Sequence, residues 1–132
     1  MKQQISTFLT FQKNNAEEAM NFYVDLFYNS EIIEIQRYGK DGPGAKRTII
    51  RAIFELNGKQ FMCSDSFIQH EWTFTPAVSN WVECNSKEEI EHFFVRLSEN
   101  GVVKMPMDYY GFSKQFSFVE DRFGVSWQLN WS

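Results

Sequence analysis

The chain has 132 residues, two cysteines and a formal net charge of −4. Its composition, 43% hydrophobic and 23% charged, excludes a disordered chain, and its length suffices for one domain with its own core. The acidic balance argues against nucleic acid as the main partner, because phosphate binding requires a basic face. The sequence shows neither a membrane-spanning apolar stretch nor a signal-peptide pattern, so we expect a soluble, cytoplasmic protein without membrane contact.

Aromatic residues make up 17% of the chain, which indicates either a thick aromatic core or an aromatic-lined pocket. Cys63 and Cys84 lie in no metal-binding spacing, and we expect both to be reduced thiols in strands. Neither histidine is expected to bind a metal, since His70 is predicted in a polar loop and His92 on the exposed side of a helix.

The first half of the chain reads as one helix among four strands. Asn15 is a plausible N-cap, and the apolar spacing after it predicts an amphipathic helix over residues 16–27. Asn57 and Gly58 form the strongest two-residue hairpin signal in the sequence. The four strands are predicted over residues 5–11, 32–38, 48–56 and 59–64.

The second half repeats this order. Ser86 is a predicted N-cap, an apolar stripe follows it at helical spacing, and Gly101 is expected to end the helix as its C′ residue. A short turn over residues 121–124 joins the last two strands. The four strands are predicted over residues 77–84, 102–109, 114–120 and 125–131.

A residue-by-residue comparison supports an internal repeat. A shift of about 71 positions aligns Glu17 with Glu88, Phe22 with Phe93 and Leu26 with Leu97. We therefore predict two βαβββ modules within a single domain. The first module covers about residues 1–66, a loop covers 67–76, and the second module covers about 77–132. The alternative is a chance similarity of two amphipathic helices.

With these elements placed, the chain resembles the PhnB-like group, whose domain description is 3-demethylubiquinone-9 3-methyltransferase. This group belongs to the vicinal oxygen chelate superfamily, which includes glyoxalase I, bleomycin-resistance proteins and extradiol dioxygenases. The resemblance implies an α+β fold whose tandem modules form curled mixed sheets around a cavity, and it implies a homodimer. It is carried by residues 15–23 (NAEEAMNFY), 26–27, 37–39, 42–44, 56–58, 61–62 and 121–128 (DRFGVSWQ).

The resemblance also implies where a metal would bind. In the metal enzymes of the superfamily, His and Glu side chains point inward from the first and last strand of each module. Strand alternation puts these positions at Phe8, Met62, Ser79 and Gln128. Phe has no lone pair, Met is a soft and weak donor, and Ser and Gln offer only neutral oxygens, so we expect no metal and no cofactor.

The same alternation predicts a cavity with aromatic and polar lining. Arg51 is a candidate anion contact if it points inward, although pairing with Glu55 or exposure to solvent is the favoured alternative. The aromatic loop that contains Tyr109, Tyr110 and Phe112 is a candidate lid, or equally part of a subunit interface. The predicted lining residues are Phe8, Thr10, Met62, Ser64, Ser79, Trp81, Glu83, Ser126 and Gln128.

Two functions follow as hypotheses, and no catalytic residue is identified. The leading one is a metal-free module, active as a homodimer, that binds a small, partly aromatic or amphipathic molecule. The alternative is an enzyme, either a metal-dependent lyase, isomerase or dioxygenase of the superfamily or the methyltransferase of the group's description. The sequence has no Gly-rich strand-to-helix turn for S-adenosylmethionine, which counts against the methyltransferase. A third reading is a cavity filled by its own side chains in a protein that acts only by assembly.

Overall fold

The computed structural model describes residues 3–132, so the first two residues of the predicted first module lie outside it. The chain forms two compact units that divide between Trp72 and Thr73, and we call them the first and second modules. The first module contains β1 (Thr7–Phe11), α1 (Ala16–Leu26), β2 (Glu31–Arg37), β3 (Ile49–Leu56) and β4 (Lys59–Asp65). The second contains β5 (Asn80–Cys84), α2 (Lys87–Ser98), β6 (Val102–Asp108), β7 (Gln115–Glu120) and β8 (Ser126–Trp131).

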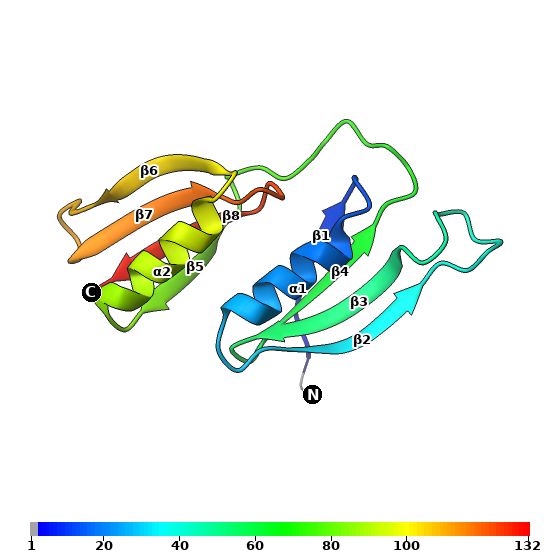
Figure 1. The fold of residues 1–132 in the computed structure, drawn as a ribbon, viewed down its shortest axis with the longest axis horizontal. Coiled ribbons are helices and arrows are strands. Elements are labelled where there is room, and N and C mark those ends of the chain that lie inside the picture. The colour runs from blue at the N-terminus through cyan, green and yellow to red at the C-terminus, as the bar shows by residue number, and fades with distance from the viewer. Residues whose placement is uncertain (1–2) are drawn as a thin grey trace. The chain divides into compact units, whose positions relative to one another are not determined.

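The two modules share one topology, which confirms the predicted repeat. The strand order is β1-β4-β3-β2 in the first sheet and β5-β8-β7-β6 in the second. In each sheet one pair is parallel, β1 with β4 and β5 with β8, and the other pairs are antiparallel. The fold is therefore α+β with two mixed four-stranded sheets, as predicted (Figure 1). The single-domain arrangement stays a prediction.

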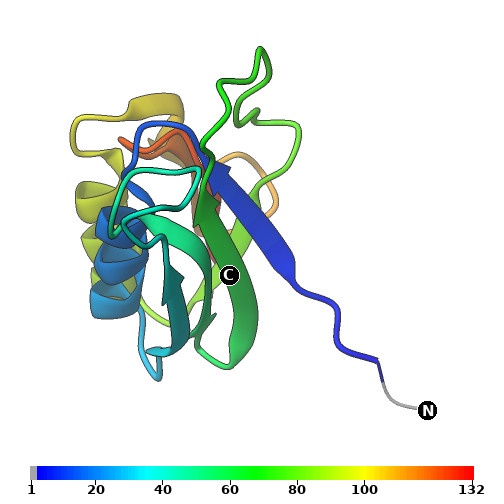
Figure 2. The ribbon, with the colours of Figure 1, turned by 90° about the vertical axis from the view of Figure 1, so that its right-hand side faces the viewer.

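Each helix covers one face of its own sheet and leaves the opposite face open (Figures 1 and 2). In the first module, Met20 and Tyr23 of α1 are buried, as are Phe54 of β3 and Phe61 of β4. In the second module, the buried residues are Ile90, Phe93 and Leu97 of α2 and Trp127 and Leu129 of β8. This apolar burial is the main stabilising term of each module. No helix among residues 3–132 has the length and apolarity needed to cross a membrane.

A buried carboxylate, rather than Asn15, caps the start of α1. Asn15 occupies the N-cap position, but its side chain makes no capping hydrogen bond because its backbone (φ −118°, ψ 20°) is not extended. Asp65 Oδ1 instead accepts a hydrogen bond from Ala16 N at 2.9 Å, and Asp65 Oδ2 accepts one from Ile49 N at 2.8 Å. Asp65 therefore fastens the start of the helix to the start of β3. At α2 the prediction is confirmed, since Ser86 Oγ accepts from Glu89 N at 3.1 Å.

The end of α2 differs from the prediction. Asn100, with φ +59°, is the left-handed residue after the helix, and Gly101 is not in that conformation. Gly101 is required for a different reason, since a Cβ at this position would overlap the backbone carbonyl oxygen of Glu120. The hairpin prediction is confirmed, because Asn57 and Gly58 both have positive φ, at +50° and +86°.

We expect Asp65→Ala to lower the free energy of unfolding by about 2–5 kcal/mol, because it leaves two buried N–H groups without an acceptor. Urea denaturation measures this loss. The matched control is Asp41→Ala in the exposed β2–β3 loop, expected to change stability by less than about 0.5 kcal/mol. Equal stabilities for the two variants would show that the Asp65 hydrogen bonds do not hold the module together.

Gly101→Ala is expected to destabilise the protein by about 1–3 kcal/mol, because the added methyl group meets backbone that has to move. Gly39→Ala is the control, since a Cβ there meets no atom within 4 Å. Thermal denaturation compares the two variants. A Gly101→Ala protein as stable as the Gly39→Ala protein would contradict the close approach of residue 101 to β7.

Candidate functional site

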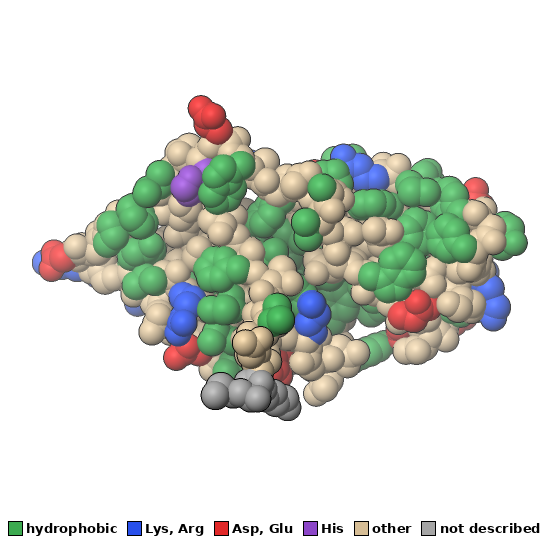
Figure 3. Space-filling model, turned by 180° about the vertical axis from the view of Figure 1, so that it is seen from behind, with side chains coloured by type: hydrophobic (Ala, Val, Ile, Leu, Met, Phe, Trp, Pro, Cys, Tyr) green, Lys and Arg blue, Asp and Glu red, His purple; other side chains and the backbone are tan. Residues whose placement is uncertain are grey.

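One helix per sheet leaves each module with an open face, defined here as the sheet face opposite the helix of the same module. Along β4, Phe61 and Cys63 are buried on the helix side, whereas Met62 and Ser64, which alternate with them, are half-buried on the open face. Seen from behind, hydrophobic side chains gather over the strands of the second module (Figure 3). Open faces that carry apolar side chains are candidate ligand-binding surfaces.

The first open face brings together four of the predicted lining residues. The parallel register of β1 and β4 pairs Phe8 with Met62 and Thr10 with Ser64. Phe8 is 48% exposed, so part of its side chain is available to a ligand. Residues that are paired across the two strands lie on the same face of the sheet. Because Leu9 and Phe11 of β1 are buried on the helix side, Phe8 and Thr10 lie on the open face with their partners.

Arg51 lies on this first open face, since it is two residues from Ile53, the register partner of Met62. Its guanidinium forms an exposed ion pair with Glu34, with Nη2 3.1 Å from Oε2. The favoured prediction is pairing with Glu55 or exposure to solvent; the side chain is 42% exposed, but its ion-pair partner is Glu34 rather than Glu55. Glu34 on the neighbouring strand β2 is a diagonal cross-strand neighbour and is within reach of the long side chain.

The second open face carries a hydrogen-bonded network. Parallel pairing sets Trp81 beside Gln128 and Glu83 beside Asn130. Gln128 Nε2 donates to Ser79 Oγ at 2.8 Å, although β5 begins at Asn80 and not at residue 77 as predicted, so Ser79 lies just before the strand. Asn130 Nδ2 donates to both oxygens of Glu83 at 3.1 Å. The predicted lining residue Ser126 belongs to this face by alternation and is buried.

Glu83 is held as a carboxylate by neutral donors. Partial burial acts to raise its pKa, but hydrogen bonds from Asn130, Trp81 and Ser132 outweigh this effect and hold the pKa below its usual range. Trp81 Nε1 donates to Oε1 at 3.2 Å, and Ser132 Oγ donates to Oε2 at 3.0 Å. A general base needs a pKa near neutrality, so this carboxylate is better suited to charge recognition than to proton transfer.

Two of the three predicted lid residues pack onto the second open face. Both contact Phe116 of β7, whose ring centroid is 5.8 Å from that of Tyr110 and 5.0 Å from that of Phe112. Phe116 in turn lies 5.8 Å from Trp81, so the loop joins the same aromatic cluster. Tyr109 is 68% exposed. The movement of a lid stays a prediction.

Sequence reasoning did not include Phe116 in the lining set. Its place follows from the β7–β8 register, which pairs Phe116 with Asn130 and Phe118 with Gln128. The sequence contained the information needed to find it, because the short turn at residues 121–124 connects β7 to β8 and thereby sets which of their residues are paired. Asp121 closes it, since its Oδ1 accepts from Phe123 N at 2.9 Å and Val125 N at 3.0 Å.

The four positions at which the resemblance predicts metal ligands form two neutral pairs. Phe8 is the register partner of Met62, and Ser79 is hydrogen-bonded to Gln128. These side chains do not fit a divalent ion, which prefers imidazole and carboxylate donors with fixed geometry. Within residues 3–132, no three His, Cys, Asp or Glu side chains gather into a group that could hold one.

Nucleophilic side chains in the described chain are not activated. Burial raises the pKa of the Cys63 thiol to about 12, helped by the charge of Asp65, and burial is also the main cause that raises the pKa of Cys84 to about 12. Ser66 Oγ lies 3.2 Å from His70 Nε2, but the hydroxyl donates its proton to the Ile68 carbonyl oxygen at 2.7 Å. None of these groups matches an activated nucleophile.

The family model described as 3-demethylubiquinone-9 3-methyltransferase matches residues 3–130. A PhnB protein from Bacillus cereus is 51% identical, with 98% of this chain and 100% of that chain covered and a TM-score of 0.95. Protein PA1353 from Pseudomonas aeruginosa is 28% identical, with 99% and 98% covered and a TM-score of 0.84. No curated protein sequence matched the chain.

A more distant structure supports the fold alone. The fosfomycin resistance protein FosX from Listeria monocytogenes is 13% identical, with 100% of this chain and 94% of that chain covered and a TM-score of 0.59. Its fold resembles that of this chain, as do the folds of the two more similar proteins. The chain belongs to the PhnB-like family described as 3-demethylubiquinone-9 3-methyltransferase.

Proposed function

We propose that this protein binds a small, partly aromatic molecule without a metal, through the open faces of its sheets. One observation carries the proposal. The positions that correspond to superfamily metal ligands hold the Phe8–Met62 and Ser79–Gln128 pairs, which offer apolar and neutral polar contacts in place of metal donors.

The exposed aromatic rings support a binding role. Phe8 is 48% and Trp81 is 53% exposed, although both lie on sheet faces among half-buried neighbours. Covering such a ring removes apolar surface from water and contributes roughly 25 cal/mol per Å². Ser79, Gln128 and Glu83 add fixed polar groups beside the rings. An apolar surface with a few placed polar groups is typical of small-molecule sites.

We propose further that the binding form is a homodimer. Each sheet ends in two outer strands, β1 and β2 in the first module and β5 and β6 in the second. Outer strands present unpaired backbone groups, which proteins cover to avoid aggregation. A second copy of the chain is one way to cover them, and homodimers are the commonest closed assemblies.

The second candidate is the methyltransferase that the family description names. It would require a cosubstrate and a group that accepts a proton near neutral pH. The side chains described above favour binding instead, because the pKa of Glu83 is lowered and the thiol pKa values of Cys63 and Cys84 are raised to about 12. Turnover of S-adenosylmethionine with any small aromatic acceptor would favour this candidate.

A screen of small aromatic molecules by two-dimensional NMR tests the proposal. We expect bound molecules to shift resonances of Phe8, Met62 or Trp81, and we expect Trp81→Ala to weaken their binding about tenfold, because it removes a ring contact.

Trp72→Ala is the matched control, since Trp72 is 56% exposed in a loop and Trp81 is 53% exposed on the sheet. It should leave the dissociation constants within about twofold. Molecules that shift only Trp72 or the helices α1 and α2 would contradict binding through the open faces.

A further inference from the structure

The second open face combines an ionised carboxylate with exposed aromatic rings. Glu83 and Trp81 lie two residues apart on β5 and therefore share one face of the sheet. They are joined by the 3.2 Å hydrogen bond from Trp81 Nε1 to Glu83 Oε1. Trp81, Tyr110 and Phe112 are 53%, 37% and 59% exposed, and the three rings surround that of Phe116. This arrangement places ring faces and one negative charge on a single surface.

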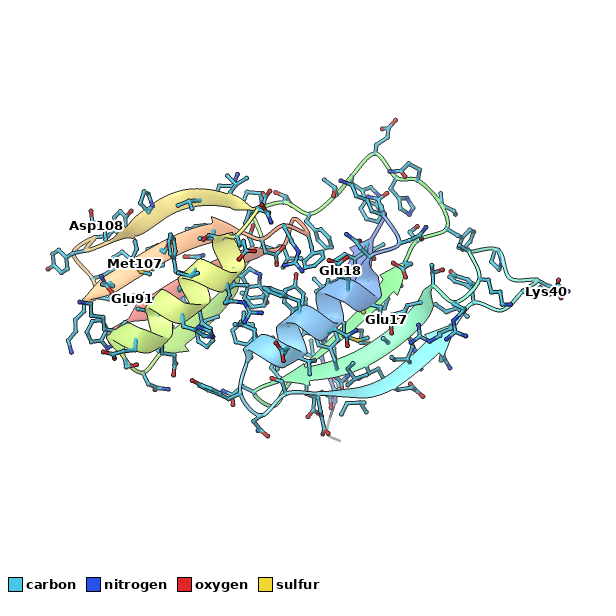
Figure 4. All side chains as sticks on the ribbon, viewed as in Figure 1. Glu17, Glu18, Lys40, Glu91, Met107 and Asp108 are labelled. Carbon is cyan, nitrogen blue, oxygen red and sulfur yellow. The ribbon has the colours of Figure 1, made fainter. Side chains whose placement is uncertain are left out.

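Glu83 has no cationic partner among the described residues. Its hydrogen-bond donors are Trp81, Asn130 and Ser132, all of them neutral. Glu17, Glu34 and Glu120, by contrast, pair with Arg37, Arg51 and Lys104. The charge of Glu83 is therefore not neutralised by any described residue, whereas Asp108 lies at the end of the opposite outer strand, β6 (Figure 4).

A second observation concerns Asn130, which is only 4% exposed. Its Nδ2 is committed to Glu83, while its Oδ1 is buried and has no hydrogen-bond partner within residues 3–132. Buried polar atoms in native proteins are nearly always paired, so an unpaired acceptor requires an explanation. Oδ1 is too deeply buried for a ligand to reach it in this structure, so the accessible acceptor is the adjoining Glu83 carboxylate, which favours a ligand that supplies N–H donors and a positive charge.

Aromatic rings add to this preference for a cation. The negative face of a ring attracts an ammonium group within about 6 Å of its centroid. The second module already contains such a contact, since Lys114 Nζ lies 4.8 Å from the centroid of Trp131. Trp131 belongs by alternation to the helix side of β8, so this lysine contact does not use the rings of the open face.

We propose that the second open face binds a small organic ammonium ion. Its charged nitrogen lies against Glu83, and its apolar or aromatic body contacts Trp81, Tyr110 and Phe112. Tyr110 is held in place for this contact, since its hydroxyl donates to the Pro106 carbonyl oxygen at 2.6 Å. The inference rests on the proposed function and adds to it the charge class of the ligand.

Three probes of similar size and different charge test it: benzylammonium, benzyl alcohol and benzoate. Each is titrated at low ionic strength while the indole N–H resonance of Trp81 is followed by NMR, after its assignment with Trp81→Phe. We expect benzylammonium to bind about fivefold more tightly than benzyl alcohol, and benzoate to bind most weakly.

Glu83→Gln preserves the size of the side chain and removes its charge, and we expect it to weaken benzylammonium binding about threefold to fivefold without changing benzyl alcohol binding. The matched control is Glu91→Gln on the exposed side of α2 (Figure 4), which makes the same change of net charge and should have no effect. Phe112→Leu, in the exposed loop, is a second variant that does not alter the Glu83 network. It should also weaken benzylammonium binding.

The outcomes separate this inference from the proposed function. Benzyl alcohol binding as tightly as benzylammonium, or Glu83→Gln without effect, would overturn the preference for a cation and leave small-molecule binding intact. Failure of all three probes to shift Trp81, while other aromatic molecules bind at Phe8 and Met62, would overturn this site alone. Failure of every aromatic molecule on both open faces would overturn the proposed function as well.

Discussion

A single helix can cover only one face of a four-stranded sheet, and the rest of this structure depends on that constraint. It splits every strand into two sets of alternating residues. One set, such as Trp127 and Leu129, packs against the helix, and the other, such as Gln128 and Asn130, faces away from it. A shift of one residue in any strand would exchange the two sets, so the burial of the apolar set fixes which side chains a ligand can reach.

The two modules use one topology but different polar contacts to hold it. In the first, Asp65 joins α1 to β3 through backbone N–H groups. In the second, Ser86 caps α2, and Asp121 binds the turn between β7 and β8. On the second open face, Glu83 joins Trp81 and Asn130 in one hydrogen-bonded network. The four positions at which the resemblance predicts metal ligands hold two neutral pairs.

The sequence predicts the architecture well because strand and helix periodicities are local properties. Alternation of Phe61 and Cys63 with Met62 and Ser64 is sufficient to assign the open face of β4, and the Asn57-Gly58 turn sets the β3–β4 register. Contacts between residues that are far apart in the sequence cannot be predicted in this way. Three examples are the capping of α1 by Asp65, the pairing of Arg51 with Glu34, and the contact of Gly101 with the carbonyl group of Glu120. Each depends on how neighbouring strands align, which the residues of one segment do not determine.

The central claim is that open faces with neutral and aromatic side chains replace a metal site. Elemental analysis of the purified, tag-free protein, followed by calorimetric titration with nickel, zinc, manganese and ferrous ions, tests it most directly. The account predicts no stoichiometric metal and no binding tighter than about millimolar. One tightly bound metal ion per subunit would contradict it, because Phe8, Met62, Ser79 and Gln128 could not supply the ligands.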